Sequence, residues 1–107
     1  MTTRERHIFQ MITRRIKELD PNAEVILYGS HARGQARKDS DWDILVLLDK
    51  DNVTLAIEQQ FRHHLLDVEL QISEPISVFV RSRSIWESKY KITPLYKSIK
   101  SEGVQLQ

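Results

Sequence analysis

The sequence contains no cysteine, only 3 glycines and 3 prolines, and no long hydrophobic run in its 107 residues. Without cysteine the chain has no disulfide scaffold, no thiol nucleophile and no cysteine-ligated zinc site. No apolar segment approaches the roughly 18 residues that a membrane-spanning helix needs. The polar residues 2–7 also differ from the hydrophobic part of a secretory signal. We therefore expect a soluble, cytoplasmic protein whose stability comes from packing.

The length of the chain limits the number of domains, and its charge distribution limits the kinds of site that we expect. A chain of 12.6 kDa is the size of one domain, so we expect residues 1–107 to form a single core. The formal net charge is only +1, but residues 1–40, 41–80 and 81–107 carry net charges of +3, −6 and +4. An acidic middle between basic ends is typical either of a cation site that faces anion-holding groups or of solvated helix faces of differing sign.

Hydrophobic spacing and turn residues predict a small α/β fold with a sheet flanked by helices. The strand over residues 41–48 has the strongest signal, because its five consecutive apolar residues from Ile44 to Leu48 are typical of a strand covered on both faces. In chain order we expect a helix ending near Leu19, strands over residues 23–28, 41–48 and 76–80, a helix over about 54–70, a short helix capped by Ser84, and a last helix between Pro94 and Gly103.

Gly29 and Ser30 follow the first predicted strand. Glycine allows a tight turn and lets an anion approach the backbone without a Cβ in the way. If the next residues form a helical turn, its free amides and the Ser30 hydroxyl make an anion site suited to phosphate. Taken alone, the same pair of residues is also ordinary turn chemistry.

Asp41 and Asp43 stand two residues apart at the start of the next strand, so their carboxylates project from the same face. Such a pair is unfavourable at the edge of a sheet unless a cation or a donor compensates it, and Mg²⁺ prefers oxygen ligands of this type. Trp42, between them, points to the opposite face and is expected in the core. A phosphate-holding turn beside a metal-holding pair is typical of phosphoryl or nucleotidyl transfer.

The segment from Gly29-Ser30 to Asp41-Trp42-Asp43 resembles the signature of the minimal nucleotidyltransferases of the DNA polymerase β superfamily. That signature is Gly-Ser, about ten residues, then Asp-x-Asp before an apolar strand, and Ala32-Arg33-Gly34 often accompanies it. The resemblance implies a small mixed sheet of the polymerase β palm type. It also implies Mg²⁺-dependent transfer of a nucleoside monophosphate, with Gly29 and Ser30 on the phosphates and Asp41 and Asp43 on the metal.

Arg33 and the third carboxylate of the family each have two interpretations. Arg33 either reaches the phosphates through its planar donor fork or forms a surface salt bridge with the acidic middle segment. In active relatives a later strand supplies a third carboxylate, and the aligned position here is Ser77, which carries no charge. Glu74 is the nearest substitute and our candidate for that catalytic role, the alternative being an exposed residue before Pro75. Without a third carboxylate the domain would bind Mg²⁺ and nucleotide but transfer slowly or not at all.

Other candidate residues have simpler interpretations. His31 is expected to be a partly exposed structural residue, and Lys38 a solvated loop residue. His63 and His64 are adjacent, which is poor spacing for one shared metal on a helix. The lysines near the C-terminus are expected to form a solvated helix face, so charge does not indicate a nucleic-acid partner.

Two functions remain open. The first is an enzyme that moves a nucleoside monophosphate, AMP, from ATP to an acceptor hydroxyl presented by a partner protein. The resemblance to small antitoxins implies that this partner is a toxin of the HEPN ribonuclease type. The second is a catalytically weakened relative that neutralises such a partner by covering it. Either function predicts exposed apolar surface.

Overall fold

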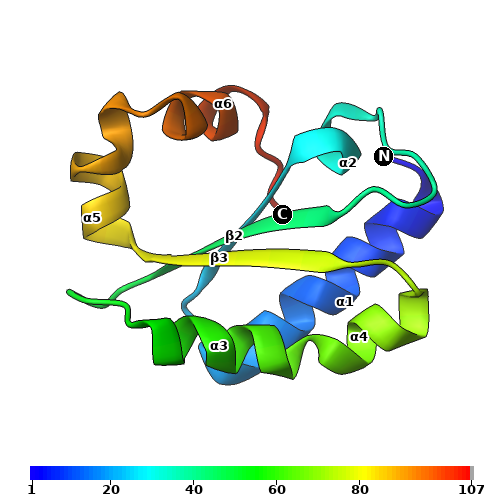
Figure 1. Cartoon of the computed structure of the whole chain (residues 1–107), viewed down its shortest axis with the longest axis horizontal. Coiled ribbons are helices and arrows are strands. Elements are labelled where there is room, and N and C mark those ends of the chain that lie inside the picture. The colour runs from blue at the N-terminus through cyan, green and yellow to red at the C-terminus, as the bar shows by residue number, and fades with distance from the viewer. Residues whose placement is uncertain (107) are drawn as a thin grey trace.

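The computed structural model describes residues 1–106 and contains a three-stranded mixed sheet with helices on both faces (Figure 1). This architecture confirms the predicted α/β fold. The elements are α1 (Thr3–Leu19), β1 (Glu24–Tyr28), α2 (Gly29–Arg33), β2 (Trp42–Leu48), α3 (Leu55–His64), α4 (Leu66–Ile72), β3 (Ile76–Ser82), α5 (Arg83–Ser88), the 3₁₀ turn η1 (Tyr90–Ile92) and α6 (Pro94–Glu102).

Strand β2 is the central strand of the sheet, as its apolar run predicts. It pairs antiparallel with β1 and parallel with β3, so the strand order is β1-β2-β3. The register sets Tyr28 opposite Asp43 on one side and Ser77 opposite Asp43 on the other. The end of β1 and the starts of β2 and β3 therefore meet at one end of the sheet.

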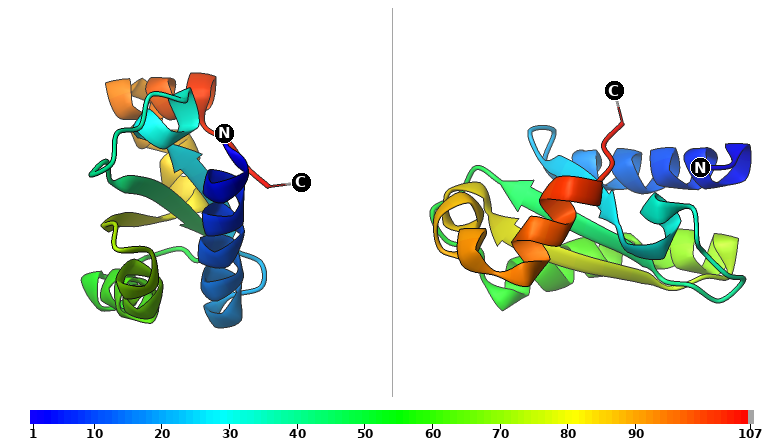
Figure 2. Two further views of the ribbon diagram at one scale, coloured as in Figure 1. Left: turned by 90° about the vertical axis from the view of Figure 1, so that its right-hand side faces the viewer. Right: turned by 90° about the horizontal axis from the view of Figure 1, so that it is seen from above.

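Two layers of helices cover the sheet (Figure 2). Helices α1, α3 and α4 cover one face, and α5, η1 and α6 cover part of the other. The side chains of β2 alternate between these layers, so Ile44, Val46 and Leu48 join the larger cluster while Leu45 and Leu47 join the smaller one. Both faces of the strand are buried for this reason.

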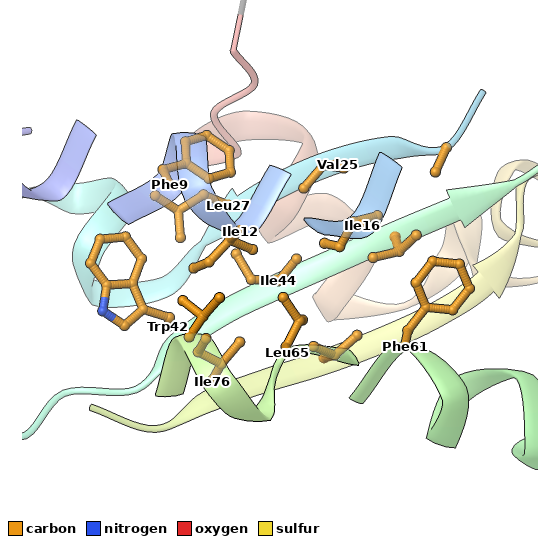
Figure 3. Close-up of a cluster of buried hydrophobic side chains, with 14 of the residues drawn as sticks. Phe9, Ile12, Ile16, Val25, Leu27, Trp42, Ile44, Phe61, Leu65 and Ile76 are labelled. Carbon is orange, nitrogen blue, oxygen red and sulfur yellow. The ribbon is translucent and has the colours of Figure 1, made fainter. Parts of the chain in front are cut away.

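The larger cluster is the main core of the protein (Figure 3). Helix α1 contributes Phe9, Ile12 and Ile16, whose spacing gives the helix one continuous apolar face. Trp42 lies at one end of the cluster and is fully buried, which confirms that it points away from the face of its neighbouring aspartates. The first residue of β2 is thus anchored in the core.

Side-chain caps explain most of the helix starts. The Thr2 hydroxyl accepts from the Glu5 amide while the Glu5 carboxylate accepts from the Thr2 amide, which is a complete capping box at the start of α1. Thr93 caps α6, with Pro94 at its first position, as predicted. None of the helices among the described residues is long and apolar enough to cross a membrane.

The structure differs from the predicted elements in three places. The helix predicted over about 54–70 is two helices that meet at Leu65, whose buried side chain packs into the core. Ser82, and not Ser84, caps α5, because β3 extends two residues beyond the predicted Val80. The turn η1 was not predicted, since three residues are too few for a periodic signal.

Candidate functional site

The Gly29-Ser30 turn connects β1 directly to α2. Gly29 has a φ of +77°, a backbone conformation that favours glycine, and the chain enters the short helix at this residue. Tyr28, at the N-cap, makes no side-chain hydrogen bond to the first amides of α2. The predicted turn, with a helical segment behind it, is therefore present.

The carboxylate of Asp43 lies directly against the backbone of Gly29. A Cβ added to Gly29 would overlap Oδ2 of Asp43 and would lie 3.1 Å from its Cγ. Only a residue without a side chain fits at position 29 while Asp43 keeps this orientation. The two halves of the sequence motif are thus in contact in the folded protein.

Asp41 and Asp43 are on the sheet face that α5, η1 and α6 leave partly open. Asp43 is half-buried and Asp41 is exposed. The Ser77 hydroxyl donates a long hydrogen bond of 3.4 Å to Oδ2 of Asp41. Ser77 also pairs in register with Asp43, so the third-strand position beside the acid pair is a serine, as the alignment predicts.

Among the described residues, the acid pair has no ion-pair partner. Within residues 1–106, no lysine, arginine or histidine forms an ion pair with Asp41 or Asp43. Burial raises the pKa of Asp43, the negative charge of Asp41 raises it further, and the charges of His31 and Arg33 oppose the rise. An uncompensated pair of carboxylate oxygens is a suitable site for a hard divalent cation.

Glu74 does not join this pair. Its side chain is only 8% exposed, forms an ion pair with Arg4, and accepts a hydrogen bond of 3.3 Å from the Trp42 indole. It therefore lies on the Trp42 side of β2 and not on the face of the aspartates. No three His, Cys, Asp or Glu side chains in the described part of the chain gather into a group that could hold a metal ion. The structure thus shows two carboxylates at the site, without the third that Glu74 was expected to provide.

Arg33 is an exposed residue at the end of α2. Its Nη1 donates to Oε1 of Glu102 at 3.3 Å, and its Nε donates to Oε1 of Gln35 at 3.2 Å. The surface salt bridge foreseen for Arg33 is present, but its partner is on α6 and not in the acidic middle segment. Its charge still reaches Asp43, where it lowers the pKa.

One side chain at the site differs from its predicted environment, and a second has no prediction. His31 is buried, and not partly exposed, because its ring lies flat against Trp42. Tyr28 was not singled out from the sequence, although strand alternation places it beside Asp43 on the open face. Burial raises the pKa of Tyr28, and the charge of Asp43 adds to the rise.

Residues 10–104 match the model of the nucleotidyltransferase domain family, so the match includes the turn, the acid pair and all three strands. The chain belongs to the nucleotidyltransferase domain family. This membership confirms the resemblance carried by the motif, and nucleotidyl transfer is the general activity of the domain. Among curated protein sequences, no significant match to the chain is found.

Solved structures with the same fold support the assignment. A toxin–antitoxin complex with AMP-PNP aligns with a TM-score of 0.66 and 19% identity over 92% of this chain and 71% of that one. A mutant form of the toxin–antitoxin MntA-HpeT aligns with a TM-score of 0.63 and 19% identity over 92% and 70%. A protein described as a minimal nucleotidyltransferase aligns with a TM-score of 0.54 and 25% identity over 96% and 89%. These likenesses show the fold.

The contact between Gly29 and Asp43 predicts that Gly29→Ala displaces the acid pair. We expect the affinity for Mn²⁺, a probe for a divalent cation, to fall about 10 to 100-fold, the range found when groups that orient metal ligands are removed. Gly34→Ala is a matched control, because Gly34 also has a positive φ, +71°, but has no atom within 4 Å of the added Cβ. Both variants lose about 1 to 2 kcal/mol from the backbone conformation. Calorimetric titration with Mn²⁺ and urea unfolding measure the two effects.

A double-mutant comparison checks that the steric overlap is the cause. In an Asp43→Ala background Oδ2 and Cγ are absent and only Cβ, 3.3 Å from the added carbon, remains. The free energies of unfolding lost through Gly29→Ala and through Gly34→Ala should therefore differ much less than they do in the native background. Equal Mn²⁺ affinity of the two single variants would contradict the proposed contact.

The raised pKa of Asp43 predicts that Asp43→Asn stabilises the cation-free protein. Because the folded pKa is above its ordinary value, folding favours the neutral carboxyl, and stability is lost as the pH rises through the folded pKa. The asparagine variant lacks this loss, so it should be the more stable protein at neutral pH. Its advantage should shrink to nothing below the ordinary pKa of aspartate. Thermal unfolding between pH 3 and pH 8, roughly the window across aspartate titration, measures the difference.

Proposed function

We propose that the domain transfers AMP from ATP to a hydroxyl group on a partner protein, with Mg²⁺ held by Asp41 and Asp43. One observation carries the proposal: the Gly29-Ser30 turn lies against an acid pair that forms no ion pair with any of the described residues. A triphosphate on the turn would bring more negative charge to these carboxylates. A divalent cation between the triphosphate and the carboxylates would remove this repulsion.

The donor set fits Mg²⁺. This ion demands near-octahedral oxygen coordination and is commonly held by one or two carboxylates together with waters and substrate phosphates. Asp41 and Asp43 supply the carboxylates, and the Ser77 hydroxyl lies beside them. When bound, the ion would neutralise charge on the phosphates and help to orient the α-phosphate. The roles of the chain itself are to hold the triphosphate at Gly29 and Ser30 and to keep the two carboxylates adjacent.

The transfer needs an acceptor hydroxyl. A bond forms between the acceptor oxygen and the α-phosphorus while the bond to pyrophosphate breaks, and the acceptor proton is released. A partner protein is supported by the toxin–antitoxin complex with AMP-PNP that shares the fold. We propose a HEPN-type toxin as this partner and a side-chain hydroxyl on it as the acceptor.

The direct test is transfer of label from α-³²P ATP to the protein encoded beside this one, in the presence of Mg²⁺. We expect label on the partner with the native domain, and a rate about 10²- to 10⁴-fold lower with Asp41→Asn or Asp43→Asn, the range typical of removing a group that acts on the reacting atoms. Asp39→Asn is the matched control, because Asp39 is an exposed loop aspartate in the same segment.

Chelation of Mg²⁺ should abolish the labelling, and excess Mg²⁺ should restore it. Equal labelling by the native domain and both variants, with Asp39→Asn unchanged, would contradict the proposed roles of the acid pair. Label that appears on the partner in the absence of the domain would also contradict them.

A second candidate function is favoured by Ser77. The residue in register with Asp43 on β3 is a serine, so residues 1–106 bring no third carboxylate to the site to accept the proton of the acceptor hydroxyl. A domain with this defect would bind nucleotide and partner yet transfer slowly, and it would neutralise the partner by covering it. In that case the native domain forms a stoichiometric complex with little label, and Asp41→Asn leaves the complex unchanged.

The two candidates are separated by Ser77→Asp, which places a carboxylate beside the acid pair. If the missing proton acceptor limits transfer, the rate of labelling should rise at least about 10-fold. Ser77→Asn is the matched control, since it adds the same bulk without the charge. A rate for Ser77→Asp no higher than that for Ser77→Asn would show that the serine is not what limits the reaction.

A further inference from the structure

A buried pair of stacked rings joins the phosphate turn to the acid pair. His31 follows Ser30 in α2, and Trp42 stands between Asp41 and Asp43 at the start of β2. The two ring centroids are 3.8 Å apart and the planes differ by 12°. The His31 side chain is only 3% exposed and Trp42 is fully buried. The rings therefore connect the two segments on the face of the sheet opposite to the one where a nucleotide would lie.

Hydrogen bonds at the ring nitrogens fix the orientation of both rings. Nδ1 of His31 lies 2.7 Å from Oε2 of Glu5, and its Nε2 lies 3.4 Å from the carbonyl oxygen of Ser40. The indole nitrogen of Trp42 donates to Oε1 of Glu74 at 3.3 Å. Neither ring is free to rotate in its plane without breaking one of these bonds. The stack is oriented as well as packed.

The first turn of α1 holds the carboxylates that orient the rings. Glu5 accepts from the Thr2 backbone amide in the capping box, and this hydrogen bond, with the one to His31, lowers the pKa of Glu5. Arg4 forms an ion pair with Glu74. The network therefore ties α1, α2, β2 and the turn before β3 to one another at the end of the sheet that carries the site.

Packing of the core alone does not explain this buried polar network. Buried carboxylates and imidazole are costly unless every group is hydrogen-bonded, and apolar side chains of similar volume would fill the space at lower cost. What a satisfied polar network adds is a unique arrangement of its members. Along a strand, the direction of Trp42 also determines where Asp41 and Asp43 point, since successive side chains alternate.

We infer that His31 is a positioning residue: by stacking on Trp42 it sets the distance between the Ser30 turn and the carboxylates of Asp41 and Asp43, and so couples cation binding to triphosphate binding. The inference rests on the proposed function. Neither ring touches the nucleotide. The stack acts only through the placement of the turn and the acid pair, where an error of about 1 Å can cost roughly 100-fold in a site of this kind.

The test measures coupling and not activity. Calorimetry gives the affinity for AMP-PNP with and without Mn²⁺, and the ratio of the two affinities is the coupling factor. We expect a factor of about 10 or more for the native domain. It should fall close to 1 in His31→Asn, which can keep a donor toward Glu5 but loses the stacked ring. The Mn²⁺ affinity without nucleotide should change less than about 3-fold, because the acid pair itself is intact.

Two further variants separate positioning from stability. Trp42→Phe keeps a ring but loses the donor to Glu74, and we expect an intermediate coupling factor. Phe61→Leu, at a buried position of α3, is the control for destabilisation, and its coupling factor should equal that of the native domain. Thermal unfolding of all the variants verifies that each is folded at the temperature of the titration.

Three results of these titrations would overturn the positioning role of His31. A native domain that couples the ligands, with His31→Asn and Trp42→Phe coupling them equally well, overturns the positioning role and leaves the proposed function standing. A coupling factor that falls in Phe61→Leu as much as in the ring variants also overturns it, since stability alone would then explain the loss. A native domain that binds neither Mn²⁺ nor AMP-PNP overturns the proposed function and the inference together.

Discussion

The backbone of Gly29 lies directly against the carboxylate of Asp43 at the end of the sheet, and this contact determines what the site can bind. The proposed function places a triphosphate at the turn, where the neighbouring acid pair repels anions. The two parts favour opposite charges, and the described residues supply no cation that reconciles them. In the proposed function, a divalent cation held by the carboxylates would remove this repulsion and allow a triphosphate to bind at the turn.

The fold keeps this end of the sheet open. Residues Leu45 and Leu47 continue the line of Asp41 and Asp43 along β2, and they are buried under Trp86, Tyr96 and Ile99. The cover ends before Asp43, which is half-buried, and Asp41 is exposed. The same strand thus contributes core at one end and the candidate site at the other. The buried His31–Trp42 stack supports the site from the opposite face of the sheet.

Features that depend on local pattern were predictable from the sequence. The apolar run from Ile44 to Leu48, the turn at Gly29, and the cap at Thr93 have signals within a few residues, and each is where the pattern predicts it. The serine beside Asp43 also followed from strand alignment. Features that depend on distant partners were not predictable. Glu74 meets Arg4 across 70 residues of chain, and no local pattern indicates that this carboxylate turns toward the Trp42 indole.

The most direct test of the account is electron paramagnetic resonance of Mn²⁺ bound to the native domain together with AMP-PNP. If Asp41 and Asp43 hold the cation against the triphosphate, the Mn²⁺ signal should show hyperfine coupling to phosphorus nuclei, because the ion contacts phosphate oxygens directly. Bound Mn²⁺ without any phosphorus coupling, in a sample whose nucleotide is also bound, would place the two ligands at separate sites and contradict the account.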